Sequence, residues 1–263
     1  MNTLILTPEA MFQGDLLLVN PSFPHHPLPH PDLVTVADTD ILLERRAVQA
    51  LDSLMAAIGG WKEIVPVSGW RALEEQQAIW EDSLAENGLP FTQTYVAYPG
   101  HSEHQTGLAI DLGRRSASID FIRPDFPYTG LCQTFRLEMA RYGLIQRYPA
   151  GKEEITGIGH EPWHFRYVGQ PHAAIMEARG LTLEEFIAWL REFPYESCRY
   201  QEKNAIVSFL PGQTSGEQEV PVRGVGGQRG GLDGHHQQSG DDLEGVQAAV
   251  TGGITHGPAS ILL

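Results

Sequence analysis

Two short segments of the chain carry side chains that could hold a metal ion and activate a water molecule. The first segment offers the imidazole of His104 and the carboxylate of Asp111. The second supplies the carboxylate of Glu161 and the imidazole of His164. Two neutral imidazoles and one carboxylate make a zinc shell that leaves a position open for water, and a further carboxylate can take a proton from that water. This set of donors is typical of a metallopeptidase.

A helical zinc motif is the competing interpretation of the second segment, which reads His-Glu-x-x-His over residues 160–164. That motif needs a helix, because only a helix places both histidines on one face. Here a proline lies inside the segment, and Phe-Arg-Tyr-Val over residues 165–168 favours a strand. We therefore expect a strand that keeps Glu161 and His164 near one site and leaves His160 free. The other ligands must then come from the first segment.

The first segment ends in a predicted strand that presents Asp111. Between Gly107 and Leu112, large aliphatic residues alternate with smaller ones. A strand places Leu108, Ile110 and Leu112 on one face and Asp111 on the other. We expect the aliphatic face to meet the core and Asp111 to face a space with room for an ion and its water.

Periodicity, caps and turn residues predict the elements around these segments. Helices are expected over residues 40–58, from Asp40 as N-cap to Gly59-Gly60, and over 72–86, 131–142, 171–179 and 183–192, the last with a Thr182/Glu185 capping box. Further strands are expected over 64–67, where Pro66 suggests a sheet edge, 91–97 and 144–148, with a surface excursion over 114–127. Strands mixed among helices indicate an α+β domain.

A polar residue falls on the apolar face of the helix expected over residues 72–86. Gln76 shares that face with Leu73, Trp80 and Leu84. A polar group in such a position needs a hydrogen-bonding partner. Either Gln76 satisfies a backbone group in the core, or it points together with Arg71 into a cleft, and the residues alone favour neither alternative.

Composition excludes several classes of function. The formal net charge is −15, from 33 acidic residues against 18 Lys plus Arg, and no basic run is present, so nucleic acid is not an expected partner. No apolar run approaches the roughly 20 residues of a membrane span, and the N-terminus lacks signal-peptide features. We expect a soluble cytoplasmic protein. Cys132 and Cys198 are too few for a disulfide scaffold, and Cys132 should pack in a helix.

Three regions are expected along the chain. Residues 1–37 form a proline-containing extended lead-in, in which His25, His26 and His30 are interpreted as solvated loop residues rather than metal ligands. Residues 38–210 form the catalytic domain. Residues 211–263 lack aromatic residues, Met, Cys and Lys and hold nearly half of the 28 glycines, so we expect a disordered tail.

The ordered set of motifs resembles the zinc D,D-peptidases of the VanY, VanX and VanXY type. Their signatures are Ser-Gly-Tyr-Arg followed by a Gln, then Ser-x-His-x-x-Gly-x-Ala-x-Asp, then Glu-x-Trp-His. Here they stand as Ser68-Gly69-Trp70-Arg71 with Gln76, as Ser102 to Asp111, and as Glu161-Pro162-Trp163-His164. The proline after Glu161 and the Ser-Glu-His-Gln-Thr-Gly run favour the VanY/VanXY branch, and the missing signal or anchor favours VanXY.

The resemblance implies a fold and a role for each matched residue. The fold is a small mixed or antiparallel sheet with flanking helices and a zinc site in the cleft, as in D,D-peptidases and hedgehog-like domains. One zinc ion per chain would be held by His104, Asp111 and His164, with Glu161 as general base. Arg71 would lie near the polarised carbonyl, and Gln76, Ser102 and Trp163 would shape the substrate subsite. Trp70 stands where the first signature has tyrosine.

The implied reaction is hydrolysis of D-Ala-D-Ala, free or at the end of a peptidoglycan precursor, with a role in resistance to vancomycin-type glycopeptides. A cell-wall remodelling carboxypeptidase or an L-Ala-D-Glu endopeptidase would use the same zinc shell. A zinc-stabilised binding module without turnover is the alternative from a different class. The presence of Glu161 and Arg71 argues against it.

Overall fold

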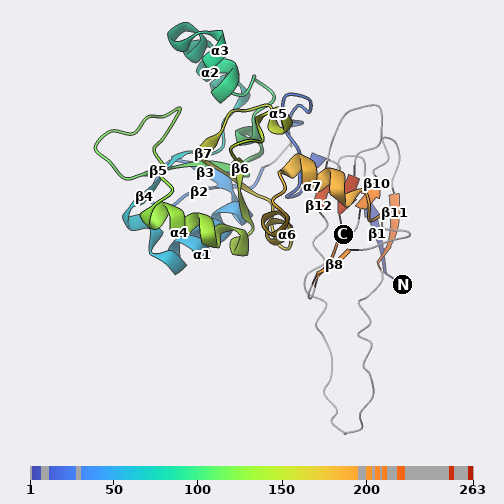
Figure 1. Ribbon diagram of the computed structural model, residues 1–263. Coiled ribbons are helices and arrows are strands. Elements are labelled where there is room, and N and C mark those ends of the chain that lie inside the picture. The colour runs from blue at the N-terminus through green and yellow to red at the C-terminus, as the bar shows by residue number, and fades with distance from the viewer. Residues whose placement is uncertain are drawn as a thin grey trace.

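A four-stranded antiparallel sheet lies at the centre of the described structure (Figure 1). The computed structural model describes residues 12–27 and 31–194 in full, together with the backbone of short strands elsewhere in the chain. In spatial order the strands are β4 (Ile64–Ser68), β5 (Ala109–Arg114), β7 (Glu161–Tyr167) and β6 (Leu144–Tyr148). The predicted α+β class is therefore confirmed, as are the strands expected at these positions.

The other elements surround this sheet. The helices are α1 (Arg45–Ile58), α2 (Leu73–Asn87), α3 (Leu89–Tyr95), α4 (Gly130–Glu138), α5 (Glu153–Thr156), α6 (His172–Arg179) and α7 (Leu183–Leu190). Three short 3₁₀ helices are η2 (Gly60–Lys62), η3 (Glu103–Thr106) and η4 (Met139–Tyr142). The remaining strands are β1 (Asn2–Leu6), β2 (Leu33–Thr35), β3 (Leu42–Glu44), β8 (Tyr200–Glu202), β9 (Ala205–Val207), β10 (Phe209–Pro211), β11 (Gln218–Val222), β12 (Ala249–Thr251) and β13 (Ser260–Leu262).

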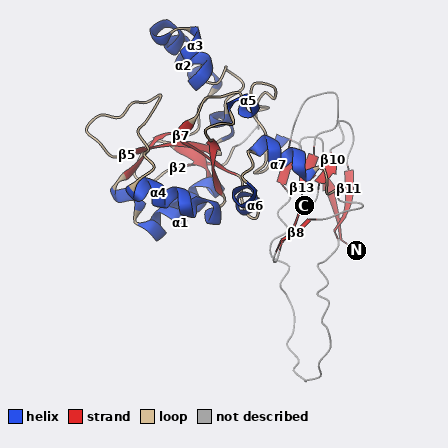
Figure 2. Cartoon of the chain, viewed as in Figure 1, coloured by secondary structure: helices blue, strands red, loops and turns tan. Residues whose placement is uncertain are grey.

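Helices α1 and α4 cover one face of the sheet (Figure 2). Leu51 and Phe135 of these helices are fully buried and pack in one core with Ile110 and Phe165 of the central strands. Cys132 of α4 is a buried free thiol in the same core, as expected. Burial of each large apolar side chain is worth about 1.5–3 kcal/mol, so this core fixes which face of the sheet is left for chemistry.

Helix α1 begins at Arg45, so Asp40 is not its N-cap. The preceding residues pair instead as the β2–β3 hairpin, and Asp40 lies in its turn. The cap is Glu44, whose carboxylate accepts a hydrogen bond from the backbone N–H of Arg46 at 2.9 Å. The residues that the sequence pattern predicts for the first turn of the helix therefore belong to the hairpin.

The strand predicted over residues 91–97 is wrong, because helix α3 occupies most of that stretch. Gly88, at φ 80°, ends α2, and Pro90 lies in the first turn of α3, where its missing N–H has no intrahelical partner to lose. Thr92 of α3 is buried and its hydroxyl lies 2.9 Å from that of Ser83 on α2. Packing against α2 outweighs the β propensity of the aromatic and β-branched residues.

The apolar face predicted for α2 does not pack. Leu73 and Leu84 are 49% and 39% exposed, and the buried residues of the helix are Gln76 and Ser83. Polar residues therefore provide the buried contacts of α2, whereas Tyr95 of α3 packs against the apolar core. The pair stands at the side of the sheet opposite α1 and α4 (Figure 1).

A second apolar cluster lies beyond β6, where α6 and α7 pack. The Thr182/Glu185 capping box predicted for α7 is present. Leu16 and Leu18 of the N-terminal lead-in are buried in this cluster, so this part of the lead-in joins the core instead of wrapping the surface.

The division into 1–37, 38–210 and 211–263 stays a prediction. His30, Cys198 and most of residues 211–263 lie outside the described residues, although strands β11, β12 and β13 fall within the predicted tail. Among the described residues, no helix combines the length and the apolar composition that crossing a bilayer requires.

His172 makes the stability of the second cluster depend on pH. Burial lowers the pKa of His172 to about 4, and its Nδ1 atom has no hydrogen-bonding partner among the described residues. Above about pH 6.5 the residue is neutral in both states; as the pH falls towards 4, only the unfolded chain takes up the proton, so stability is lost. Between about pH 7.5 and pH 5 we expect a loss of about 2 kcal/mol from this residue.

Urea unfolding of chelator-treated protein at the two pH values measures this loss. The variant His172→Gln, which cannot titrate, should lose about 2 kcal/mol less than the unsubstituted chain between them. Equal losses in both proteins would show that His172 does not carry the pH dependence.

Candidate active site

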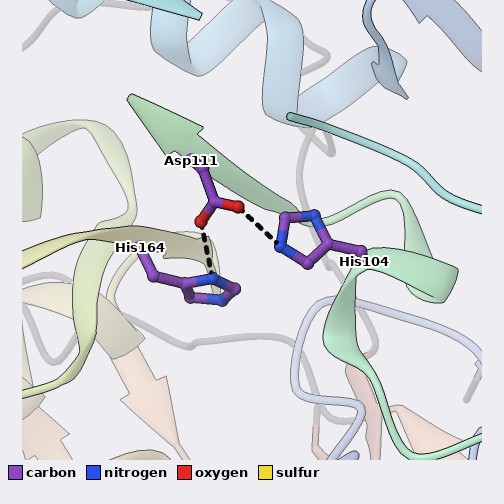
Figure 3. A group of neighbouring side chains, drawn as sticks. All are labelled: His104, Asp111 and His164. Carbon is purple, nitrogen blue, oxygen red and sulfur yellow. Dashed lines mark hydrogen bonds and ion pairs between the residues drawn. The ribbon is translucent and has the colours of Figure 1, made fainter. Parts of the chain in front are cut away.

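His104, Asp111 and His164 converge on one point from three separate elements, η3, β5 and β7 (Figure 3). Asp111 lies between the two imidazoles. Its Oδ2 atom is 3.1 Å from His104 Nε2 and its Oδ1 atom is 2.9 Å from His164 Nδ1. One candidate ligand atom from each residue lies within 4.8 Å of the others. The structure thus brings together the three metal ligands that the resemblance implied.

The register of the central sheet places two of these three side chains, Asp111 and His164. Asp111 on β5 pairs directly with His164 on β7, and directly paired residues of antiparallel strands project from the same face of the sheet. The neighbouring pair, Ile110 and Phe165, projects into the core on the opposite face. Burial of that apolar pair therefore holds Asp111 and His164 on the open face.

His104 reaches the same point from η3, which bends back over the sheet. Ser102 caps this helix by accepting a hydrogen bond from the His104 backbone N–H at 3.3 Å, and Gly107 ends it at φ 73°. A side chain at Gly107 would meet the backbone nitrogen of Glu44 at 3.2 Å, so only glycine fits without displacement. The ring Nδ1 of His104 lies 2.6 Å from the carbonyl oxygen of Gly69, which leaves Nε2 with its lone pair directed at the cluster.

Glu161 reaches the site because β7 is irregular. Against β6, Phe165 pairs with Gln146 and Glu161 pairs with Tyr148. Between these two pairs β7 therefore has more residues than β6, so its register is irregular. In a regular strand, residues three apart would face opposite sides, but here Glu161 Oε2 lies 3.7 Å from His164 Nδ1. The Glu161 carboxylate accepts no hydrogen bond from the described residues, so it is available to a water or a substrate.

Arg71 occupies the other side of the cluster. Its guanidinium donates to Ser68 Oγ at 2.8 Å, to Gln76 Oε1 at 3.1 Å and to Asp111 Oδ2 at 3.0 Å. Gln76 in turn donates to the carbonyl oxygen of Ala97 at 2.8 Å. Both alternatives for Gln76 therefore hold in part, because it satisfies a backbone group and also anchors Arg71.

Burial and neighbouring charges shift the pKa values of the site residues in different directions. Burial and the Arg71 charge lower the pKa of His104 to about 4, so this imidazole is neutral at pH 7. Burial would lower the pKa of His164, but Asp111 raises it to about 9. Burial would raise the pKa of Asp111, but the two imidazoles hold it well below its usual range. Burial raises the pKa of Glu161 to about 8, with Asp111 and Glu103 adding to the effect.

A solvent-open cleft of about 460 Å³ leads to these residues. Its lining includes Arg71, Ser102, Glu161 and Trp163, four of the residues expected at the catalytic or substrate site. Gln76 is fully buried and is not part of the lining, so it can act on a substrate only through Arg71.

His160 takes no part in the cluster. Its Nε2 atom lies 2.8 Å from the hydroxyl of Tyr128, and the segment around it is the strand β7 rather than a helix. The strand interpretation of the His-Glu-x-x-His segment is therefore confirmed.

Comparison with known proteins shows the family. The model of the VanY family, described as D-alanyl-D-alanine carboxypeptidase, matches residues 40–170. VanXYC of Enterococcus gallinarum, a bifunctional D-Ala-D-Ala dipeptidase and D-Ala-D-Ala carboxypeptidase, is 44% identical over 175 residues, covering 64% of this chain and 92% of that protein. The chain belongs to the VanY family. The resemblance inferred from the motifs is confirmed.

Two solved structures extend the similarity to the fold. The vancomycin-resistance D,D-dipeptidase VanXYg, solved with a D-Ala-D-Ala phosphinate analogue, matches with a TM-score of 0.79 at 44% identity, covering 84% of this chain and 90% of that one. A variant of the D,D-pentapeptidase VanY from a VanB-type resistance cassette, solved with Zn(II), matches with a TM-score of 0.57 at 32% identity, covering 66% and 98%. The fold of this VanY-family chain is thus that of the D,D-peptidases.

Sequence reasoning missed three buried charges beneath this VanY-family site. Glu103, Arg147 and Arg166 are each no more than 1% exposed, and the carboxylate of Glu103 accepts hydrogen bonds from both arginines. A signal for two of them was present, because Glu103 precedes His104 and Arg166 shares a strand face with His164. Nothing in the local pattern of Arg147 distinguishes it from a surface arginine.

Removal of the Gln76 side chain should impair catalysis while leaving His104, Asp111 and His164 in place. In Gln76→Ala, Arg71 loses one of the four side-chain partners that the described residues give it, so we expect kcat for peptide hydrolysis to fall about 10- to 100-fold with an unchanged metal content. Gln77→Ala is the matched control, because Gln77 is exposed and bonds only to Glu81 on the same helix. The two variants are compared by steady-state kinetics and metal analysis, and equal kcat values would contradict the anchoring role of Gln76.

Proposed function

We propose that this protein is a zinc-dependent D,D-peptidase that hydrolyses D-Ala-D-Ala, as the free dipeptide and at the C-terminus of peptidoglycan precursors. The observation that carries the proposal is the convergence of His104, Asp111 and His164 with Glu161 beside them in a cleft. Similarity to VanXYC, which has both activities, supports the substrate class.

The three donors fit a zinc ion by their chemistry. His104 offers Nε2 and His164 offers Nδ1, and Asp111 adds a carboxylate oxygen, which is the two-imidazole, one-carboxylate set of catalytic zinc sites. A zinc ion bound there would polarise the scissile carbonyl and lower the pKa of a bound water towards about 7. His164 must lose its proton to solvent before it can serve as a ligand, so metal affinity should weaken as the pH falls.

Glu161 would act as the general base. Its carboxylate lies beside the ligands and has a pKa raised to about 8, so the protonated and ionised forms differ little in energy near neutral pH. A carboxylate whose protonated and ionised forms are close in energy can take a proton from the attacking water and return it to the departing amine. Arg71, buried and charged at the cleft wall, would donate to the oxyanion that forms on the scissile carbonyl.

We further propose a cytoplasmic location and a role in glycopeptide resistance. Hydrolysis of the free dipeptide is useful where precursors are assembled, and loss of the D-Ala-D-Ala end removes the group that vancomycin-type antibiotics bind. Ser102 and Trp163, which line the cleft, are proposed to shape the substrate subsite.

Glu161→Gln should abolish turnover while leaving zinc bound. The amide keeps the size of the side chain but cannot accept the proton, and loss of a general base typically costs about 10²–10⁴ in rate. Glu154→Gln is the control, since Glu154 is exposed on α5 near the same strand. Zinc content by metal analysis and D-alanine release by a colorimetric assay distinguish the variants; turnover within a factor of a few of the unsubstituted protein would remove Glu161 from the role of base.

Three substrates test the proposed specificity. Purified zinc-loaded protein is incubated with D-Ala-D-Ala, with a pentapeptide precursor that ends in D-Ala-D-Ala, and with an L-Ala-D-Glu peptide. We expect D-alanine release from the first two and its loss after chelation. Cleavage of the L-Ala-D-Glu peptide alone would identify an endopeptidase, and stoichiometric zinc with no cleavage of any substrate would identify a binding module.

A further inference from the structure

A buried ion cluster lies directly behind His164, on the side away from Asp111. Glu103 Oε1 accepts hydrogen bonds from Arg147 Nε at 2.7 Å and from Arg166 at 2.8 Å. Within the described part of the chain its other oxygen, Oε2, has no hydrogen-bonding partner, and it lies 3.6 Å from His164 Nε2. His164 Nε2 is likewise buried without a partner. Two unsatisfied buried atoms of complementary chemistry therefore face each other.

The two nitrogens of His164 have different tasks. Nδ1 lies in the donor cluster, 2.9 Å from Asp111 Oδ1, so it is the nitrogen that must present a lone pair to a metal ion. A neutral imidazole then carries its hydrogen on Nε2, the atom that faces Glu103. A carboxylate in that position stabilises this tautomer and fixes the plane of the ring.

We propose that Glu103 is a positioning residue for the metal site, which holds His164 with its Nδ1 lone pair directed at the ion. This inference rests on the proposed zinc function. His104 is oriented in another way, because its Nδ1 lies against the carbonyl oxygen of Gly69. The two histidines would therefore bind the ion through different ring nitrogens, Nε2 of His104 and Nδ1 of His164. Glu103 and His104 are adjacent in η3, and one short helix thus supplies a ligand and the support for a second ligand.

The two arginines keep Glu103 in its charged form and in place. Burial alone would raise its pKa, but Arg147 and Arg166 lower it far below the usual range. Arg166 also donates to the carbonyl oxygens of Asp15 and Leu17, so its guanidinium is fixed from the N-terminal lead-in. A carboxylate with one oxygen clamped by two fixed guanidinium groups has little freedom, and its second oxygen stays towards His164.

A purely structural role is the competing explanation, because a buried ion cluster can serve folding alone. The chain contains a control for it. Arg147 is shared between Glu103 and Glu184 of α7, which accepts two hydrogen bonds from the guanidinium and one from Asn20 Nδ2 at 3.0 Å. Glu184 belongs to the same cluster but does not touch His164. Its substitution weakens the cluster without removing the carboxylate behind the ligand.

The test compares zinc affinity in Glu103→Gln and Glu184→Gln. Dissociation constants are measured by competition with a chromophoric chelator, on samples shown by circular dichroism to be folded without metal. We expect Glu103→Gln to weaken zinc binding about 10- to 100-fold, and Glu184→Gln to weaken it by less than about threefold even though both are destabilised towards urea. Equal affinities in the two variants would overturn the proposal.

A second measurement needs no variant, and it can still refute the proposal if Glu103→Gln does not fold. Long-range ¹H–¹⁵N spectra of the zinc-loaded, histidine-labelled protein report which ring nitrogen carries the hydrogen. We expect the hydrogen on Nε2 of His164 and on Nδ1 of His104. The same tautomer in both ligands would overturn the assignment of Glu103, whereas failure of the unsubstituted protein to bind zinc would overturn the proposed function and this inference with it.

Discussion

The pairing of Asp111 with His164 across β5 and β7 is the constraint on which the site depends. Directly paired residues share a face, and a slip of one strand by one residue would turn its donor towards the core. The register is fixed from the other side of the sheet, where Ile110 and Phe165 are buried with α1 and α4. Apolar burial therefore positions a polar site.

Once those two donors are fixed, the other groups reach them by local departures from regular structure. His104 enters from a four-residue 3₁₀ helix ended by a glycine in the left-handed region, and Glu161 enters through an irregularity in β7. Arg71 leaves the end of the edge strand β4 and is held by Ser68 and Gln76. Irregular elements of this kind are common at functional sites.

The sequence predicted the central strands, the donors and the α+β class, because these follow from local patterns: period-two alternation over residues 107–112 and donor types in fixed spacing. It failed where tertiary contacts decide. Helix α3 replaces a predicted strand because it packs on α2, and the start of α1 is lost to a hairpin. The burial of Arg147 could not be predicted, since the ion cluster that it joins is assembled from residues distant in the chain.

The central claim is that side chains distant in sequence hold a single ion. Anomalous diffraction at the zinc absorption edge, on crystals of the zinc-loaded protein, tests it most directly. The account predicts one anomalous peak per chain, within coordinating distance of His104 Nε2, an Asp111 carboxylate oxygen and His164 Nδ1, with Glu161 beside it but not bound. A peak at any other set of residues, or none at these three, would contradict it.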